Sequence, residues 1–195
     1  MAEAVEATAA ATEEFDNRVD HLLQCTCEVA RAMVDAHQAA MAMLVGGDWT
    51  HARKYFSLSD EYAEWKGFRM PAQGIGLHAM VVAEKKAIRL KEDEVVKHPA
   101  WRGFAESVGK HPPLRGLLAV PIVGEHGLNY GLLQVSDKVD GRDFGDVDER
   151  RLQCLADAAA VGLDAFRKVR SLRVGDPVPA AAVEAQANFV VIEPA

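Results

Sequence analysis

The sequence predicts an α+β domain built around a mainly antiparallel sheet. Two apolar runs, Leu117–Val123 and Tyr130–Val135, flank the turn-rich segment Gly124–Asn129, which is the pattern of a β-hairpin. A long helical pattern follows this hairpin and begins at Asp146. Another helical pattern lies near the start of the chain, so we expect the strands between two long helices.

The first long helix is predicted over residues 14–37. Apolar or small side chains recur there at alternating spacings of four and three, which places them on one face of a helix. They are Phe15, Val19, Leu22, Thr26, Val29 and Met33. Such a face packs either on the sheet of its own chain or against the same helix of a second copy. The preceding residues 1–13, rich in Ala, Glu and Thr, are expected to form a disordered or loosely ordered tail.

A hairpin and a helical insert are predicted next. The run Ala40–Val45, a Gly-Gly-Asp turn signal and the weakly alternating segment Lys54–Leu58 indicate two paired strands. Ser59 is placed to cap a short helix over Asp60–Lys66.

Shorter elements are predicted in the middle of the chain. We expect a helix over Leu77–Ala83 and a strand over Ala87–Leu90, followed by a polar segment, Lys91–Lys97. His98–Phe104 leads into another short helix. Two prolines after His111 then break the chain before the second hairpin.

The closing helix is predicted over residues 146–172. Its apolar and small residues form a nearly heptad seam, namely Leu152, Leu155, Ala159, Gly162, Phe166 and Val169. This seam fits a helix lying on the sheet, and it also fits a bundle with the first helix. Residues 173–195 form a Pro/Ala-rich tail whose strand-like end, Phe189–Ile192, either adds to a sheet edge or remains frayed.

The loop between the second hairpin and the closing helix carries a distinctive set of residues: Asp137, Lys138, Phe144, Asp148 and Glu149. An ion pair between Lys138 and Asp148 would tie the end of a strand to the start of the helix. Phe144 is apolar in a polar loop and is expected to anchor it. Asp146 is suited to the N-cap, and the acidic first turn meets the positive end of the helix dipole. This set therefore has a structural role.

These residues resemble the closing motif of GAF domains, the small-molecule sensor modules of signalling proteins. The family motif reads Asn-Lys, a variable gap, Phe, three residues and Asp-Glu, so Asp137 stands where the family has Asn. That difference makes a cyclic nucleotide an unlikely ligand. The segments Arg115–Pro121, Gly127–Lys138 and His98–Phe104 are also similar to GAF units of bacterial sensor kinases, as is the Tyr62-x-x-Trp65 pair.

The resemblance covers roughly Asp20 to Val169. It implies a GAF/PAS-like antiparallel sheet of about six strands, with the flanking helices on one face and a ligand pocket on the other. The pocket candidates are Phe56, Tyr62, Trp65, His78, Trp101, Phe104, Arg115, Gln134 and Ser136. For the aromatic residues the alternative is core packing. His78 and Arg115 could instead be satisfied by a structural hydrogen bond or salt bridge, and Gln134 and Ser136 could lie on a solvated face.

The composition argues against several classes of function. A net charge of −7 argues against nucleic acid, and no apolar run approaches the about 20 residues of a membrane span. The acidic start lacks the features of a secretory signal, and three cysteines do not suggest a disulfide framework, so we expect a soluble cytoplasmic protein.

Catalytic signatures are absent, and the protein is predicted not to be an enzyme. One GAF branch reduces free methionine sulfoxide with pocket cysteines, but Cys25, Cys27 and Cys154 fall on the flanking helices, which also argues against a cysteine-linked bilin. No metal or cofactor is predicted; haem held by one histidine would fall to His78 or His111.

The resulting hypothesis is a non-enzymatic GAF-type sensor or regulatory module that binds a small molecule. It would signal through the helices 14–37 and 146–172 to a second copy or a protein partner, because no output domain is recognisable in the sequence. The alternative is a structural or docking subunit of a larger assembly that keeps the fold without binding a ligand.

Overall fold

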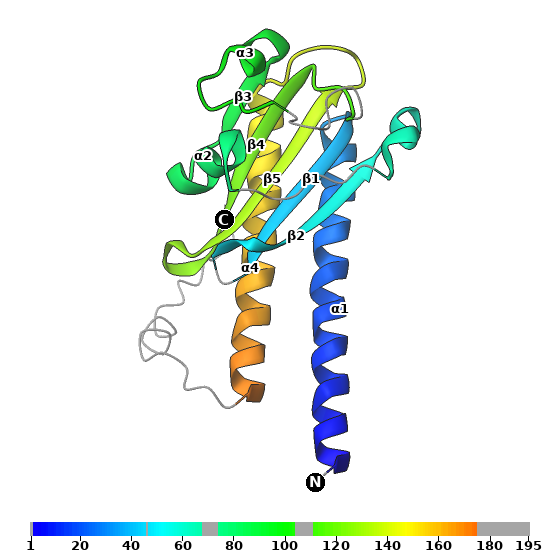
Figure 1. Cartoon of the computed structure of the whole chain (residues 1–195), viewed down its shortest axis with the longest axis vertical. Helices are drawn as coiled ribbons and strands as arrows, with labels where there is room; N and C mark the ends of the chain where they lie inside the picture. Colours follow the sequence, from blue (N-terminus) through cyan, green and yellow to red (C-terminus); the bar gives the residue numbers. More distant parts are fainter. Residues whose placement is uncertain (1, 46, 68–73, 104–110, 175–195) are drawn as a thin grey trace, which may run out of the picture.

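A five-stranded antiparallel sheet forms the centre of the computed structural model, which describes residues 2–45, 47–67, 74–103 and 111–174 (Figure 1). The strand order is β2-β1-β5-β4-β3. The strands are β1 (Ala36–Val45), β2 (Asp48–Leu58), β3 (Ile88–Lys91), β4 (Gly116–Val123) and β5 (Asn129–Lys138). The predicted α+β class and antiparallel sheet are confirmed, with five strands in the described residues where about six were expected.

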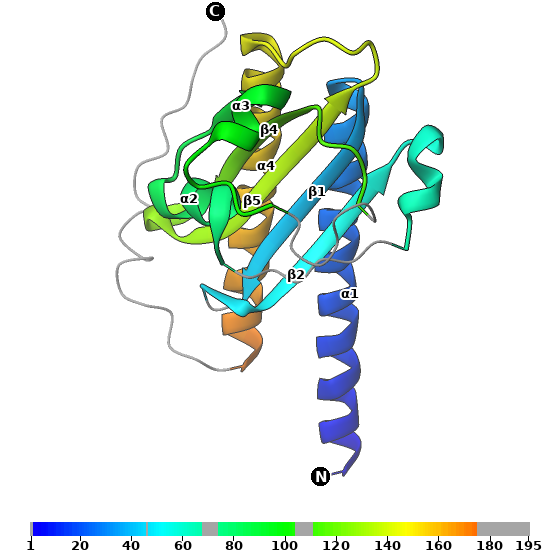
Figure 2. The same cartoon turned by 45° about the horizontal axis from the view of Figure 1, so that its top comes forward.

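Two long helices cover one face of the sheet. Helices α1 (Ala2–Met33) and α4 (Asp146–Val174) lie side by side against this face, which we call the helix side (Figures 1 and 2). The opposite face carries two short helices, α2 (Gly76–Glu84) and α3 (Glu92–Lys97), and we call it the α2 side. The 3₁₀ helix η1 (Asp60–Trp65) follows β2, and the 3₁₀ helix η3 (Glu125–Gly127) connects β4 to β5.

The main hydrophobic core lies on the helix side. Large apolar side chains from the sheet and both helices pack together there and are almost completely buried: Leu23, Val34, Met41, Leu118, Val120, Ile122, Leu133, Val135 and Leu152. Ala39 and Met41 of β1 and Leu133 and Val135 of β5 belong to this cluster at a spacing of two, because side chains of a strand alternate between faces. The helical seams predicted from the sequence therefore lie, at least in part, on the chain's own sheet.

The two central strands, β1 and β5, approach each other closely at Gly131. This residue pairs with Met43 and has a φ of +129°, and a β-carbon there would collide with the carbonyl oxygen of Ala42. Only glycine fits such a position. The glycine at this point of the second hairpin is thus required by the sheet itself.

Several element boundaries differ from those predicted. Helix α1 begins at Ala2, before residue 14, and ends at Met33 because Asp35 adopts a left-handed backbone with φ of 50°. The polar segment at residues 92–97 forms α3, where Lys97 pairs with Asp93 and Glu94 accepts a hydrogen bond from the Lys91 backbone. The short helix expected after His98–Phe104 and the strand-like end at Phe189–Ile192 lie outside the described residues.

Candidate functional site

The middle of the α2 side combines small, polar and apolar side chains. Strand register places three rows of residues there: Leu58, Gln38, Ser136 and Leu117; Phe56, Ala40, Gln134 and Ala119; Lys54, Ala42, Leu132 and Pro121. The β1 strand contributes only alanine to two of these rows, so its methyl groups lie low between the longer side chains of β2 and β5. Ala40 is only partly buried although β1 is an interior strand.

Helix α2 places His78 over this floor. The Nε2 atom of His78 shares a hydrogen bond with Oε1 of Gln134 on β5, so two predicted site residues are brought together from different elements. Burial lowers the pKa of His78, and the positive charge of Lys54 lowers it further. A neutral His78 therefore donates from Nε2 to the Gln134 oxygen, and the Gln134 amide group remains a donor.

Lys54 is a member of this site that the sequence interpretation missed. It lies between Arg53 and Tyr55, whose side chains bond Asp20 of α1, so Lys54 extends toward the α2 side. The side chain is partly buried, and burial lowers its pKa. The signal was available in the sequence, because Lys54 and Phe56 have the two-residue spacing of side chains on one face of a strand.

Ser136 lies at the other end of the floor and is fully buried. Its hydroxyl has no hydrogen-bond partner among the described residues. A buried hydroxyl without a partner costs free energy, which a ligand or water can recover. The three polar candidates His78, Gln134 and Ser136 thus share one side of the sheet.

A second group of polar residues closes the end of the sheet around Asp137. This residue has a left-handed backbone with φ of 57°, which Asp and Asn tolerate better than most residues. Its buried carboxylate accepts hydrogen bonds from the Arg115 backbone N–H and, at 3.3 Å, from the Tyr62 hydroxyl of η1. Burial raises the pKa of Asp137 and raises that of Tyr62 to about 12. An Asp in place of the family's Asn therefore retains the tolerance for a left-handed backbone and the oxygen that accepts these hydrogen bonds.

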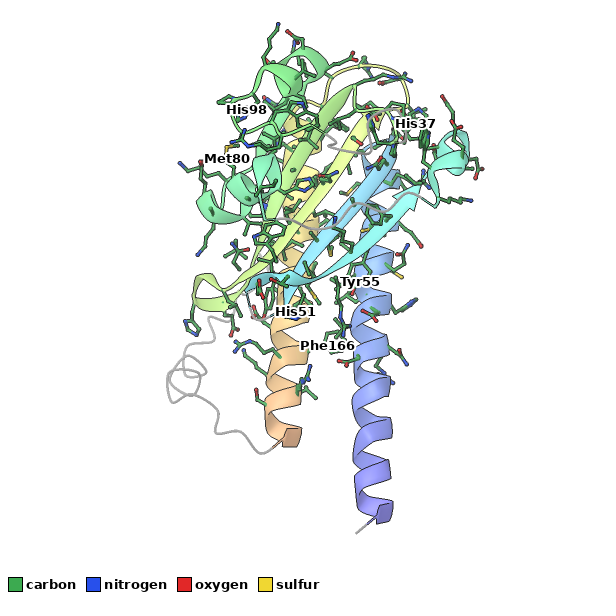
Figure 3. All side chains as sticks on the ribbon, viewed as in Figure 1. His37, His51, Tyr55, Met80, His98 and Phe166 are labelled. Atoms are coloured by element: carbon green, nitrogen blue, oxygen red, sulfur yellow. The ribbon has the colours of Figure 1, made fainter. Side chains whose placement is uncertain are left out.

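His37 connects η1 to the same end of the sheet, and the sequence interpretation did not single it out. Its ring stacks on Tyr62 with centroids 4.6 Å apart, and its Nδ1 lies 2.9 Å from the Ser59 hydroxyl. Figure 3 shows His37 at the end of β1 beside η1. Ser59 stands at the predicted N-cap position, but its side chain makes this contact and caps no N–H group. Tyr62 thus has a structural partner on both sides.

The residues of the loop motif make contacts between the end of β5 and the start of α4. Lys138 Nζ lies 3.0 Å from Asp148 in a nearly buried ion pair, and Phe144 is buried in the helix-side core. The expectation that Asp146 caps the helix is wrong: α4 starts at Asp146, and the Asp148 carboxylate accepts the Gly145 N–H at 2.8 Å. Asp146 instead pairs with Arg89, which also contacts Glu149.

Trp101, Trp65 and Arg115 each have surroundings of their own. Trp101 packs beside Leu77, Val95 and Leu117 under α2 and α3, as the core alternative expects. Trp65 is partly buried at the end of η1, the Arg115 side chain is exposed, and Phe104 lies outside the described residues. His111, the other histidine considered for haem, has Nδ1 2.6 Å from the Pro112 carbonyl oxygen.

The turn between β4 and β5 contacts helices of both layers. On the α2 side, Asn129 donates to the Val82 carbonyl and Lys85 donates to that of Gly127, at 2.7 Å. On the helix side, Asp164 of α4 accepts the Glu125 N–H at 2.8 Å and the Tyr130 hydroxyl at 2.7 Å. One short turn is therefore hydrogen-bonded both to the end of α2 and to α4.

The cysteines of the chain lie away from the α2 side. All three cysteines are free and lie on α1 or α4, and burial raises the pKa of Cys27 to about 12, so it is an unreactive thiol. Within the described ranges no group of three or more His, Cys, Asp or Glu residues could hold a metal ion. Nor is any described helix long and apolar enough to cross a bilayer.

Comparisons with solved structures identify the same fold. The GAF domain of a phosphoenolpyruvate-protein phosphotransferase from Coxiella burnetii has a TM-score of 0.61 at 18% identity, covering 86% of this chain and 96% of that one. The blue-light absorbing PixJ GAF domain from Thermosynechococcus elongatus has a TM-score of 0.60 at 10% identity, with coverages of 83% and 94%. A type II free methionine-R-sulfoxide reductase from Thermoplasma acidophilum has a TM-score of 0.57 at 18% identity, with coverages of 78% and 96%.

The sequence itself matches the same family over most of its length. A family model of the GAF domain matches residues 18–163, which include all five strands, α2, α3 and the sheet-packed parts of α1 and α4. The closing motif at residues 137–149 and the floor of the α2 side fall within this range. The chain therefore belongs to the GAF family, whose domains are small-molecule-binding sensor modules.

Proposed function

We propose that this GAF domain is a non-enzymatic sensor that binds a small metabolite on the α2 side of its sheet and signals through α1 and α4. One observation carries the proposal. The two faces of the same strands differ: the helix side is packed with large apolar residues, while the α2 side combines smaller apolar clusters with alanines and with polar groups around the His78–Gln134 contact. Apolar side chains with a few convergent polar groups are typical of a ligand site.

The contacts of the β4–β5 turn support a route from the site to the long helices. His78 is on α2, the end of α2 is hydrogen-bonded to the turn, and the turn is hydrogen-bonded to α4. A ligand that binds one position of α2 more tightly than another would bias the position of α4. Asp164 and Lys168, whose Nζ lies 2.7 Å from the Glu125 carboxylate, are the residues of α4 through which this bias would pass.

The surface of the long helices supports a second copy or a protein partner. Val161 and Val169 of α4 are 69% and 41% exposed, and Val29 of α1 is 50% exposed. Apolar side chains exposed on the signalling helices are suited to association. The same valines are the observation that favours the alternative, a docking subunit without a ligand. We place the protein in the cytoplasm, in agreement with its three free cysteines and acidic composition.

Thermal unfolding of the purified chain with a metabolite library tests the sensor proposal. A ligand that binds the native state raises the melting temperature. At a hundredfold excess over Kd it adds about 2.7 kcal/mol to the free energy of unfolding. Gln134→Ala is expected to abolish the shift, while Gln153→Ala on the far side, in α4, is expected to retain it. If no metabolite shifts the wild-type transition and the native protein is found in a large assembly by light scattering, the docking alternative replaces the sensor.

A further inference from the structure

We propose that the outer side of the two long helices is an interface between two copies of this chain. By the outer side we mean the surface of α1 and α4 that faces away from the sheet. The inference rests on the proposed function, because it names the partner of the signalling helices. It follows from the apolar side chains that are exposed there, from the shape of the surface that they form, and from its size and charges.

Four of the eight large apolar side chains that are exposed in the described part of the chain lie on α1 and α4. They are Val29 on α1 and Val147, Val161 and Val169 on α4, and Val161 is the most exposed at 69%. The other four lie on four separate segments, namely Ile75, Val96, Leu128 and Val139. A single exposed valine is ordinary, but several on two adjoining helices mark an interaction surface.

Helical geometry places these valines away from the sheet. Successive residues of an α-helix are about 100° apart, so residues two positions apart point in nearly opposite directions. Val29 is two positions from Cys27, and Val161 is two positions from Leu163, both of which are buried in the helix-side core. Val147 is about four turns before Val161, on nearly the same face of α4. Because α1 and α4 lie side by side, the valines share one surface (Figures 1 and 2).

The surface between the valines of α4 is low, because small residues occupy it. Cys154, Ala158 and Ala165 are exposed and follow the same face as Val147 and Val161, at spacings of three, four and seven. Small side chains let a facing helix approach closely, and a valine of that helix can enter the space beside an alanine. Since each copy has both the valines and the alanines, the surface is complementary to itself, as a two-fold symmetric interface requires.

The size and the charges of the outer side also suit a second copy. From Val147 to Val169 helix α4 extends about 33 Å, and two adjacent helices are about 20 Å wide, which gives about 700 Å² per copy. Specific interfaces of standard size bury about 800 Å² per partner. Exposed charges of both signs flank the valines, with Arg151 and Asp157 on α4 and Glu28 on α1. A surface of one sign would repel its own copy, whereas a surface of mixed sign does not.

Self-association of the full chain, measured without any ligand, tests the inference. Sedimentation velocity over a range of protein concentrations is expected to show an equilibrium between monomer and dimer. Val161→Lys places a charge in the apolar part of the interface and is expected to raise the Kd of the dimer by at least about tenfold. Val96→Lys on α3, at a valine that is 60% exposed, is the matched control and is expected to associate as the wild type does. Circular dichroism confirms that each variant is folded.

The exposed thiol of Cys154 provides a second measurement. In a Cys25→Ser background the remaining third cysteine, Cys27, is buried and unreactive, so a bulky maleimide reports on Cys154. Labelling is expected to slow as the protein concentration rises through the Kd of the dimer. In the Val161→Lys variant the labelling rate is expected to remain high over the same range.

The outcomes separate the two proposals. A wild type that stays monomeric, a dimer that Val161→Lys leaves intact, or equal weakening by Val161→Lys and Val96→Lys would overturn the interface. Labelling of Cys154 that does not depend on protein concentration would overturn it as well. A metabolite that still shifts the melting temperature would then leave the sensor function standing, whereas a dimer that binds no metabolite would retain the interface without the sensor.

Discussion

The two faces of the sheet are made by the same strands, yet they are built differently. Leu133 and Gln134 are neighbours on β5, and Met41 and Ala42 are neighbours on β1. Leu133 and Met41 are buried in the core beneath α1 and α4, whereas Gln134 and Ala42 belong to the opposite face with α2. The largest apolar cluster thus lies on the helix side, and two smaller clusters lie on the other face.

The largest expected effect comes from truncation on the helix side. Leu133→Ala should lower the free energy of unfolding by about 3 kcal/mol, because a fully buried leucine leaves both a lost transfer term and a cavity. Its neighbour Gln134→Ala should cost less than about 1 kcal/mol, since one hydrogen bond to His78 is lost. Urea unfolding of both variants measures the difference, and equal losses would contradict the contrast between the faces.

A smaller effect is expected where α4 holds the β4–β5 turn. Asp164→Ala removes the acceptor for the Glu125 N–H and for the Tyr130 hydroxyl, and should destabilise the protein by about 2 kcal/mol. Asp157→Ala on the exposed face of the same helix, where Asp157 bonds only Gln153 among the described residues, should cost less than about 0.5 kcal/mol.

The Asp164→Ala variant also tests whether ligand binding on the α2 side is coupled to α4 on the helix side. If the turn couples the two faces, Asp164→Ala should retain ligand binding on the α2 side and lose any ligand-dependent change in hydrogen exchange of α4. A variant in which that change persists would show that the coupling follows another path.

The smallest effect is expected at Asp137, where the ends of both faces meet. Burial raises the pKa of this carboxyl in the folded protein above its unfolded value of about 3.9. A raised pKa means that the folded state holds its proton more tightly, so stability from this group is full at low pH and falls as the pH rises through the folded value. Asp137→Asn retains the acceptor and the left-handed backbone and should not show this fall.

The wild type and the Asp137→Asn variant should therefore have equal free energies of unfolding near pH 3, and the variant should be the more stable of the two at pH 7. Urea unfolding across this range measures the difference. A wild type that gains stability relative to the Asn variant as the pH rises would show that hydrogen bonds to the carboxylate outweigh its burial.

Local patterns in the sequence predicted most of the fold. The hairpin at residues 117–135 and the helix from Asp146 were recognisable because their signals, alternation, turn residues and helical spacing, all lie within short segments. Helix α3 was missed because it is short, polar and stabilised by side-chain pairs such as Lys97–Asp93 more than by an apolar face. The early start of α1 was missed because its first residues have no clear apolar seam.

The site was less predictable because it depends on pairings between distant segments. Gln134 and His78 were candidates from the resemblance, but their contact joins a strand to a helix 56 positions away. Lys54 and His37 have neighbours that only the strand register and the position of η1 reveal. Trp101 was expected in the pocket, and nothing local distinguishes a pocket tryptophan from one that packs on Leu117.

The pairing of β1 with β5 also has a consequence for the order of folding. Ala36 is opposite Lys138, so the middle of the sheet joins segments separated by almost the whole domain, while β2 and β4 reach their neighbours through short hairpins. Closing such a long loop is slow, and contacts far apart in sequence form late. During synthesis the β1–β2 hairpin must wait with an open edge until β5 has left the ribosome.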